Sequence, residues 1–552
     1  MKRKTIATIL VCGLCVSMLS ACGEEESSSS RREKKSNKNK TESSKDLDEV
    51  FNELGGLFGR GEDKPAAMPE PTETVEEDYN QPDEDYVADT QPLDPDETGD
   101  IESEAWDPVY EEEPGIVEDE QDDPFVPLVD PWTGKPYDLG GIEIIVRNWM
   151  APEEPDPPHS AYEESRYEWR QWAMETYNFT IKELPIGDWY SAPQDYTDYV
   201  NSGGDDNCYV FMVREDELTA EALNNGLMYD LASFDCLDFT ESKFTNNKIH
   251  ELYGKNEKIY AMNAGFAEPG VGMWFNKRIL TEAGIDPESI YDMQAAGTWT
   301  WEAWTDIMAK VQRDIDNDGV TDIYGMDADY STAVCQAVYS NDAEFVGKDE
   351  YGKYVYEFEN PETVEALEWI VDVFDDYGME RPEYASWNYC NEAFLNGQVA
   401  FLPAEAYIGY PGSLLESMVD EIGFVMFPKG PNADDYVNCW NNNAFVIPDC
   451  YDAEKAWKIA FAWNLYTDEV PGYEGYMELT NYLAGVFDDR AVEETIIPMM
   501  NKGMVTYHTM ISWIDMENEF LYEFGRNMNM KVSDILDKNR NNFNLSINHA
   551  NQ

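Results

Sequence analysis

A long acidic stretch without a single basic residue limits which part of this chain can fold. Residues 65–134 contain 25 Asp and Glu side chains and no Lys or Arg, while Pro and Gly recur and apolar residues are sparse. Such a segment cannot bury enough apolar surface to offset its ordering entropy, and its like charges keep it extended. A Ser-rich segment precedes it. We therefore expect residues 22–135 to be a disordered tether and residues 136–552 to carry the fold.

The N-terminus has the pattern of a targeting segment. Residues 2–4 are basic, and residues 5–19 form an apolar run that is too short for a stable membrane span. The run ends in Leu19-Ser20-Ala21-Cys22, which resembles the bacterial lipobox. This resemblance implies that residues 1–21 are a lipoprotein signal peptide, that Cys22 is lipidated, and that the chain is anchored extracellularly at the outer face of the cytoplasmic membrane. The alternative is an ordinary secretory signal with a chance Cys.

The charge of the chain restricts its partners. The net charge is -74, and from Lys135 onward 26 basic residues face 76 acidic ones, so the folding part is itself strongly acidic. This argues against nucleic acid and anionic ligands and is compatible with neutral or cationic ones. Four scattered His residues leave little material for a His-based metal or acid–base site. Six body cysteines permit disulfides or free thiols: Cys208, Cys236, Cys335, Cys390, Cys439 and Cys450.

From about residue 138, strand and helix patterns alternate. Residues 142–146 read as a strand after a Gly-Gly turn, and residues 162–177 carry aromatics at helical spacing. Residues 209–213 read as a second buried strand, and residues 217–224 as a helix that stops at Asn225-Gly226. Strands that alternate with helices indicate an α/β sheet.

Residues 270–330 contain a series of short motifs in a fixed order. They are Phe275-Asn276-Lys277, Ala283-Gly284, Thr298-Trp299 and Tyr324-Gly325. Two further blocks follow in the same order along the chain, residues 394–401 (FLNGQVAF) and residues 422–431 (IGFVMFPKGP). Together they resemble extracellular solute-binding protein family 1, the family that includes maltose-binding protein. The resemblance covers roughly residues 138–552.

The resemblance implies a periplasmic-binding-protein-like fold, in which two α/β lobes are joined by a hinge and the ligand cleft lies between them. Lobe I would contain about residues 138–275 and 439–485, and lobe II about residues 276–438 and 486–552. The implied function is capture of a carbohydrate, an oligosaccharide, for delivery to the permease subunits of an ABC importer. The chain would be a monomer, would need no cofactor and would not be an enzyme.

Two alternatives keep the same fold. One is a binding protein for a peptide, polyamine or other solute, and the other is a surface lipoprotein for adhesion or sensing without transport. A secreted glycosidase would be an enzyme of another class. Its paired carboxylates cannot be singled out among 112 acidic residues, and no nucleophile elbow, zinc motif or phosphate loop is present.

The candidate ligand-binding residues follow from positions that match the family's cleft. Sugars need aromatic faces against their rings and planar polar groups for their hydroxyls. The candidates are Trp149, Arg214, Glu215, Glu268, Asp329, Tyr330, Tyr407, Trp440, Asn441, Asn442 and Trp513. For each of them, core packing or simple solvation is the competing interpretation.

Two other features have structural interpretations. Trp301 and Trp304 share one face of a helix that Thr300 can cap, which favours core packing for both. The acidic loop Asp314, Asp316, Asp318 and Asp322 has the early spacing of a calcium loop, with Gly at position six. Its twelfth position is Gly325 instead of the bidentate Glu, so a loop held by Asx turns competes with calcium binding.

Overall fold

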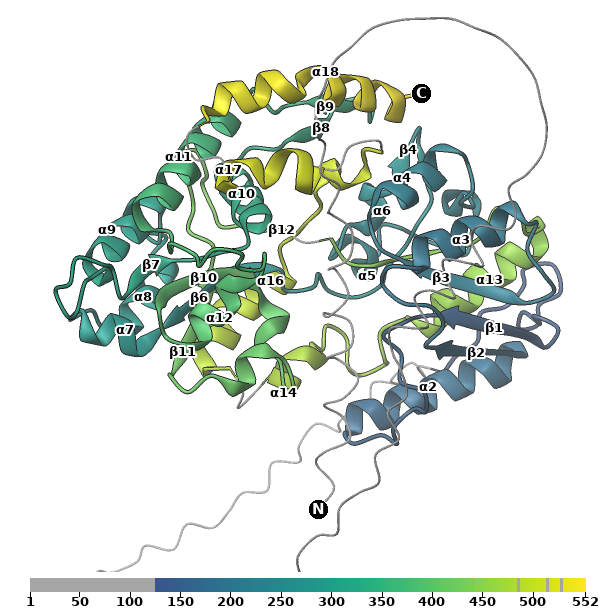
Figure 1. Cartoon of the computed structure of the whole chain (residues 1–552). Helices are drawn as coiled ribbons and strands as arrows, with labels where there is room; N and C mark the ends of the chain where they lie inside the picture. Colours follow the sequence, from purple (N-terminus) through teal and green to yellow (C-terminus); the bar gives the residue numbers. More distant parts are fainter. Residues whose placement is uncertain (1–124, 440, 484–486, 513–515, 527–529) are drawn as a thin grey trace, which may run out of the picture. The chain divides into compact units, whose positions relative to one another are not determined.

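The computed structural model describes residues 125–439, 441–483, 487–512, 516–526 and 530–552 (Figure 1). The predicted signal peptide, the predicted lipidation site Cys22 and the predicted tether up to residue 124 lie outside the described residues. Two predicted ligand-binding residues, Trp440 and Trp513, lie outside them as well.

The first large sheet has the strand order β13-β3-β1-β2. Strands β1, β2 and β3 are parallel, and β13 runs antiparallel to β3. The bounds are β1 (Ile142–Arg147), β2 (Phe179–Leu184), β3 (Cys208–Val213) and β13 (Ala444–Val446). The helices of this part are α2 (Ala161–Tyr177), α3 (Ala192–Asn201), α4 (Glu217–Asn224), α5 (Ser242–Thr245), α6 (Ile249–Leu252) and α13 (Ala453–Tyr466). The predicted strands and helices of this region are confirmed to within a residue at each end.

The second large sheet has the strand order β11-β6-β10-β7. Strand β10 pairs parallel with β7, and β6 runs antiparallel to both β10 and β11. The bounds are β6 (Val271–Asn276), β7 (Tyr324–Met326), β10 (Val399–Glu405) and β11 (Ile422–Met426). The helices are α7 (Lys277–Glu282), α8 (Glu288–Ala295), α9 (Trp301–Val311), α10 (Tyr330–Tyr339), α11 (Pro361–Tyr377), α12 (Tyr389–Leu395), α14 (Glu478–Leu483), α15 (Asp489–Ala491), α16 (Ile497–Met500), α17 (Glu523–Arg526) and α18 (Val532–Ala550).

Three two-stranded ladders complete the described β-strands. They pair β4 (Gly254–Lys255) with β5 (Lys258–Ile259), β8 (Val346–Lys348) with β9 (Tyr354–Tyr356), and β12 (Asn438–Cys439) with β14 (Gly503–Met504). A π-helical turn, η5 (Val492–Ile496), lies against β11. The chain thus forms two α/β lobes, each built around one large sheet, as the sequence resemblance implies.

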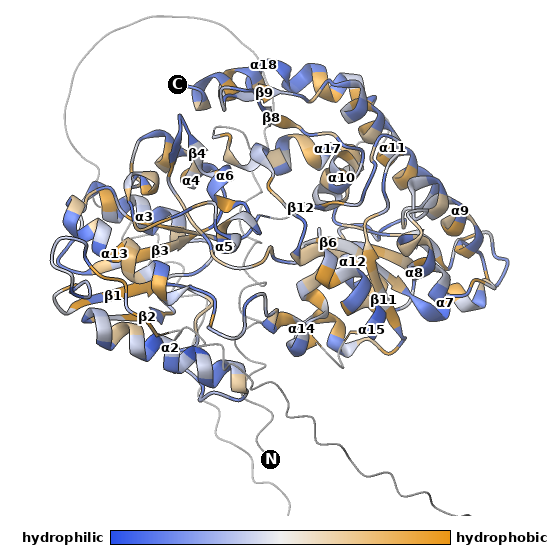
Figure 2. Cartoon of the chain, turned by 180° about the vertical axis from the view of Figure 1, so that it is seen from behind, coloured by the Kyte–Doolittle hydropathy of each residue, from blue (hydrophilic) through white to orange (hydrophobic). Residues whose placement is uncertain are grey.

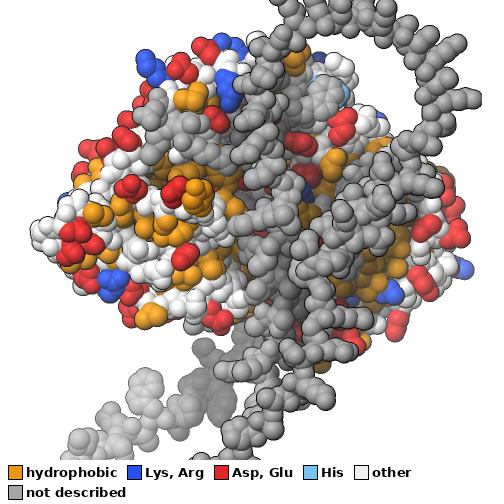
Figure 3. Space-filling view, viewed as in Figure 1, with side chains coloured by type: hydrophobic (Ala, Val, Ile, Leu, Met, Phe, Trp, Pro, Cys, Tyr) orange, Lys and Arg blue, Asp and Glu red, His pale blue; other side chains and the backbone are white. Residues whose placement is uncertain are grey.

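Hydrophobic residues concentrate on the strands of both sheets, whereas the covering helices alternate between hydrophobic and hydrophilic residues (Figure 2). The side chain of Thr300 accepts a hydrogen bond from the backbone of Ala303 and so caps α9. This orients Trp301 and Trp304 inward, where both are buried, as predicted. Acidic side chains are spread over the visible face with few Lys or Arg among them (Figure 3), so the acidity belongs to the folded surface.

The chain crosses between the two sheets three times. The first crossing, residues 263–270, leads into β6, and the second, residues 438–443, returns to β13. Backbone hydrogen bonds between Met262 and Phe445 join these two crossings at one end. At the other end the side chain of Asn438 accepts from Gly270 N and donates to Glu268 O. The third crossing, residues 467–477, follows α13.

Two predicted lobe boundaries are corrected by this topology. Strand β6 begins at Val271 and belongs to the second sheet, so the boundary expected after residue 275 falls inside a strand of lobe II. Helix α14, placed in lobe I by the sequence, packs through Tyr482 against Tyr410, which follows β10. Packing against residues far along the chain decides to which lobe each of these elements belongs.

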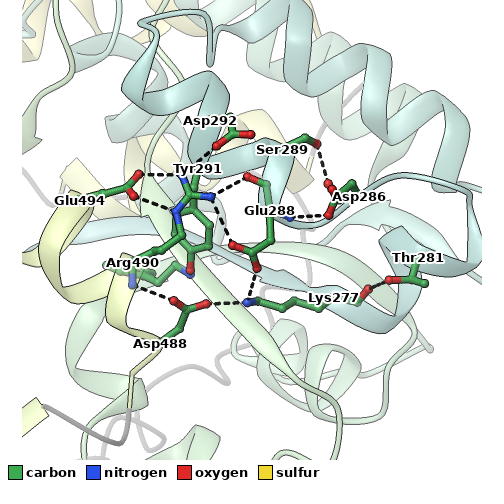
Figure 4. Close-up of polar contacts among 11 residues, drawn as sticks. Lys277, Thr281, Asp286, Glu288, Ser289, Tyr291, Asp292, Asp488, Arg490 and Glu494 are labelled. Atoms are coloured by element: carbon green, nitrogen blue, oxygen red, sulfur yellow. Dashed lines mark hydrogen bonds and ion pairs between the residues drawn. The ribbon is translucent and has the colours of Figure 1, made fainter. Parts of the chain in front are cut away.

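The Phe275-Asn276-Lys277 motif has a structural role in lobe II. The ammonium of Lys277 donates to Glu288 at 2.9 Å and to Asp488 at 2.5 Å. Arg490 adds ion pairs to Glu288 and Glu494, so one charged network joins α7 and α8 to the chain that returns after α14 (Figure 4). Lys277 therefore stabilises lobe II from within.

Candidate ligand-binding site

The direction of the strands brings the predicted residues to one edge of each sheet. Ligands of open α/β sheets bind outside the carboxyl ends of the strands. In the first sheet, segments that follow β1 and β3 and the segment that precedes the antiparallel β13 share this edge. In the second sheet, the same holds for segments after β7 and β10 and before β6. The predicted residues at these edges are Trp149, Arg214, Glu215, Asn441 and Asn442 in the first lobe and Glu268, Asp329, Tyr330 and Tyr407 at the second sheet.

Arg214 holds an exposed tryptophan at the edge of the first sheet. Its guanidinium lies 3.9 Å from the centre of the Trp189 ring, and its Nε donates to Trp189 O at 2.9 Å. An ion pair with Asp216 at 2.9 Å fixes the guanidinium from the other side. Trp189 is 44 % exposed. It therefore presents a flat aromatic face whose position is set by a charged neighbour.

Sequence reasoning missed Trp189. The signal was available, because two adjacent aromatics, Trp189 and Tyr190, follow a short Pro- and Gly-containing loop directly after the strand β2. Both rings remain exposed and meet edge to face, with centres 5.0 Å apart. An aromatic pair that stays exposed at a strand's carboxyl end is a stronger indication of a ligand contact than aromatic content alone.

Glu215 is the most perturbed acid at this edge. Burial raises its pKa to about 8, and the carboxylates of Asp216 and Glu268 add to the rise. The half-buried carboxyl is therefore protonated at neutral pH and can donate a hydrogen bond as well as accept one. The interaction with Glu268 also shows that the end of β3 lies near the first crossing.

A second exposed tryptophan lies near the end of β7. Asp327, which follows this strand, forms a buried ion pair with Arg381, whose Nη2 lies 2.8 Å from a carboxylate oxygen. Arg381 also donates from Nη1 to Trp387 O at 3.0 Å and so fixes the loop that carries this ring. Trp387 is 36 % exposed. Each sheet edge thus carries one exposed Trp held by an arginine that is itself ion-paired.

Asp329 and Tyr330 are engaged in packing. The carboxylate of Asp329 caps α10 by accepting from Thr332 N, and its other oxygen accepts from Tyr522 OH at 2.6 Å. The guanidinium of Arg381 lies 4.5 Å from the centre of the Tyr330 ring. With its ring packed in this way, Tyr330 offers less free aromatic surface than Trp387.

The side chains of the predicted asparagines, Asn441 and Asn442, form hydrogen bonds that stabilise the crossings. Asn441 is buried, donates to Thr506 Oγ1 at 3.0 Å and accepts from Thr506 N at 2.9 Å. Asn442 accepts from Glu268 N at 3.1 Å, which links the second crossing to the first. Trp149 and Tyr407 are half-buried at their sheet edges. They remain candidates for ligand contact.

The acidic loop after α9 uses its carboxylates to hold its own backbone. Asp314 accepts from Asn317 N and Gly319 N, and Asp322 accepts from Ile315 N at 2.6 Å. Asp316 and Asp318 each accept from the backbone amide two residues on. Oxygens of Asp314, Asp316 and Asp322 lie within 4.8 Å of one another, and Asp318 is not part of this group. The Asx-turn interpretation therefore accounts for the loop.

Two further findings concern the described part of the chain. All six body cysteines are free thiols there, so the disulfides that the sequence permitted are not formed. Among the described helices, none combines the length and the apolar character that a membrane crossing requires.

The sheets, their carboxyl edges and the paired crossings define the class: a two-lobe α/β fold of the binding-protein type. No protein-family model matches the chain, and no curated protein sequence matches it. Solved structures align with it over their whole length. An ABC substrate-binding protein from Listeria monocytogenes in complex with cycloalternan is 14 % identical and has a TM-score of 0.46, with 74 % of this chain and 98 % of that chain covered.

Two further solved structures are similar to the same extent. The cyclic alpha-maltosyl-1,6-maltose binding protein from Arthrobacter globiformis is 13 % identical, with a TM-score of 0.48 and coverage of 74 % of this chain and 98 % of that one. UgpB from Mycobacterium tuberculosis, in complex with glycerophosphocholine, is 14 % identical, with a TM-score of 0.48 and the same coverage. The fold assignment itself rests on the strand order and the crossings, and the named ligands belong to those proteins.

Proposed function

We propose that this chain is a solute-binding protein that captures a carbohydrate between its two sheet edges and delivers it to an ABC importer by hinge closure. The observation that carries the proposal is the pair of exposed tryptophans, Trp189 and Trp387, one at each carboxyl edge. Closure about the crossings would bring two such faces onto opposite sides of a sugar ring, and ring C–H faces pack well on aromatic faces.

The polar groups at the edges suit a neutral polyhydroxyl ligand. Glu215, protonated at neutral pH, is both donor and acceptor, while the guanidiniums of Arg214 and Arg381 are already paired with acids. A ligand without a formal charge leaves these pairs intact, whereas a charged ligand would have to compete with them. This favours a carbohydrate over a polyamine or a charged peptide.

Anchoring and transport are part of the proposal. The lipobox-like sequence before Cys22 supports attachment to the outer face of the cytoplasmic membrane, with the acidic segment as a tether. The motifs in residues 270–330 support a role beside permease subunits. The alternative without transport, a surface protein for adhesion or sensing, predicts the same ligand contacts and no interaction with a permease.

The direct test is a thermal-shift screen of the full chain without its signal peptide against mono- and oligosaccharides, with peptides and polyamines alongside. A ligand that binds only the folded state stabilises it by about 2.7 kcal/mol at a hundred times its dissociation constant. We expect a shift with at least one saccharide, which is recovered intact. A shift with peptides or polyamines alone would refute the carbohydrate proposal and keep the binding-protein fold.

Variants then test the site with the saccharide found in the screen. Replacing Trp189 or Trp387 by Ala should each weaken binding by about 1–3 kcal/mol, as for other aromatic anchors. Trp132 is the matched control, because it is 93 % exposed and lies on the segment before β1. Equal affinity in the Trp132, Trp189 and Trp387 variants would remove the two tryptophans from the site.

A further inference from the structure

A separate polar cavity of about 250 Å³ lies beside the first sheet. It is floored by Val146 and Glu183, near the carboxyl ends of β1 and β2. Its walls come from α2, from the end of α13, from residues 263–266 of the first crossing and from residues 467–476 of the third. None of the ligand-binding residues predicted from the sequence lines it. The volume approaches that of small-molecule pockets.

One wall of the cavity is a cluster of three tyrosine rings. Tyr162, on the first turn of α2, lies with its ring centre 4.5 Å from that of Tyr476 and 5.3 Å from that of Tyr473. The two tyrosines of the third crossing meet edge to face at 5.6 Å. Such a cluster offers an aromatic surface for the body of a ligand with a flat ring.

The charged groups of the cavity other than Arg170 are bonded to protein partners, through ion pairs or, for Glu183 and Glu469, through hydrogen bonds from neutral donors. Lys243 pairs with Asp468, and Arg166 pairs with Glu478 at 2.6 Å. Glu183 accepts from Asn148 Nδ2 at 2.7 Å and from Tyr466 OH at 3.2 Å, one bond to each oxygen. These groups therefore hold one another in place and demand no ligand charge.

Arg170 differs from the other charged groups of the cavity. Its Nε donates to Tyr466 O at 3.1 Å, and its guanidinium lies 3.7 Å from the centre of the Tyr466 ring. In the described part of the chain it forms no ion pair with a carboxylate, although acids outnumber bases about threefold in the folded part. Burial lowers its pKa, since the charged form loses hydration there. The carboxylate of Glu183 attracts this guanidinium without forming an ion pair with it, and among the described residues the terminal nitrogens of Arg170 have no hydrogen-bond partner. A ligand can supply the hydrogen bonds that these nitrogens lack.

We propose that this cavity binds a small carboxylate attached to a ring, with the terminal nitrogens of Arg170 paired to the carboxylate and the tyrosine cluster against the ring. A planar guanidinium pairs with a carboxylate through two parallel hydrogen bonds, which a neutral hydroxyl cannot reproduce. The overall negative charge opposes an anion only weakly here, because salt screens charges more than about 8 Å away. Neither of the two exposed tryptophans lines the cavity, so the proposal does not rest on them.

The test is isothermal titration calorimetry of the full chain without its signal peptide, with two carboxylates and their neutral counterparts. Benzoate is compared with benzyl alcohol, and glucuronate with glucose, so the two pairs also distinguish an aromatic ring from a sugar ring. We expect one carboxylate to bind at least about ten-fold more tightly than its neutral counterpart, as for a charge-assisted pair. Absence of binding by both carboxylates, or equal binding of a neutral counterpart, would overturn the proposal.

Variants separate the anchor from general stability. Arg170→Met should reduce the affinity for the carboxylate at least about ten-fold, and Arg170→Lys should reduce it less because charge remains without the planar fork. Arg540→Met is the control, since Arg540 is an exposed arginine on α18. If Arg170→Met is less stable than the wild type, the affinity of the Arg170→Lys variant for the carboxylate decides whether Arg170 is the anchor. If both Arg170 variants bind the carboxylate with wild-type affinity, the assignment of Arg170 is overturned. If the wild type binds no saccharide in the thermal-shift screen, only the proposed function fails.

Discussion

Replacing Arg381 by Met should destabilise the second lobe strongly, because it leaves the buried carboxylate of Asp327 without its ion-pair partner. The side chains of Asp327 and Arg381 are 4 % and 12 % exposed. Nε of Arg381 donates to both oxygens of Asp327 at 3.1 Å, and further bonds reach Ala328 O and Trp387 O. Breaking a buried pair by removing one partner costs about 3–5 kcal/mol, since the remaining charge is uncompensated.

The pH dependence of this loss follows from Asp327. Burial already raises the pKa of Asp327, with Arg381 opposing the rise. Without Arg381 the folded-state pKa rises further above the unfolded value of about 3.9. A group with a raised folded pKa loses its stabilising contribution as pH increases. The deficit of the variant relative to wild type should therefore grow as pH rises above the unfolded value and shrink in acid.

Urea unfolding followed by circular dichroism measures this deficit, with Arg381→Met/Asp327→Asn as the partner variant. The double variant lacks the stranded charge and should regain much of the loss. Arg540→Met, which removes an exposed ion pair with Glu359, should cost far less. A loss below about 1 kcal/mol, or a double variant no more stable than Arg381→Met, would refute the reasoning.

Three further predictions concern other parts of the fold. Glu215→Gln should gain melting temperature relative to wild type as pH rises towards about 8, and the gain should level off above it. Burial raises the pKa of Glu215 to about 8, so below that pH the unfolded wild type releases a proton that the folded wild type retains, which costs stability; parallel curves would contradict this. Trp301→Ala should lose about 3–5 kcal/mol in urea unfolding, since Trp301 stacks on Trp369 with ring centres 3.9 Å apart. Calcium should leave the melting temperature unchanged, and a rise abolished by Asp314→Asn would show that the acidic loop binds the ion.

The elements of this fold were largely predictable from the sequence, because local patterns determine them. The cap at Thr300, the inward Trp304 and the strand at residues 142–146 each depend on neighbours within a few positions. The family motifs then gave the order of the two lobes. The lobe boundary at β6 was placed wrongly, because the partners of this strand, β10 and β11, lie more than a hundred residues further along the chain.

The candidate site was predictable only as a set of chain positions. Asn441 and Asp329 lie at the expected sheet edges, yet their side chains bind Thr506 and Tyr522, which are 65 and 193 residues away. No local pattern shows that such a polar group is already occupied. The exposure of Trp189 and Trp387 depends in the same way on tertiary packing, because most aromatics of the described residues are buried or half-buried.

The late return of the chain to the second sheet bears on how the protein assembles. Strand β11 is covered by η5, and α18 packs against β9, so residues after 490 complete a core that begins at β6. During synthesis from the N-terminus, the chain can form the β1–β3 unit early. The second lobe cannot complete its core until the last helix, α18, has been synthesised. Truncation near the C-terminus should therefore yield a protein whose first lobe is folded, while its second lobe is incompletely folded, exposes apolar surface and aggregates.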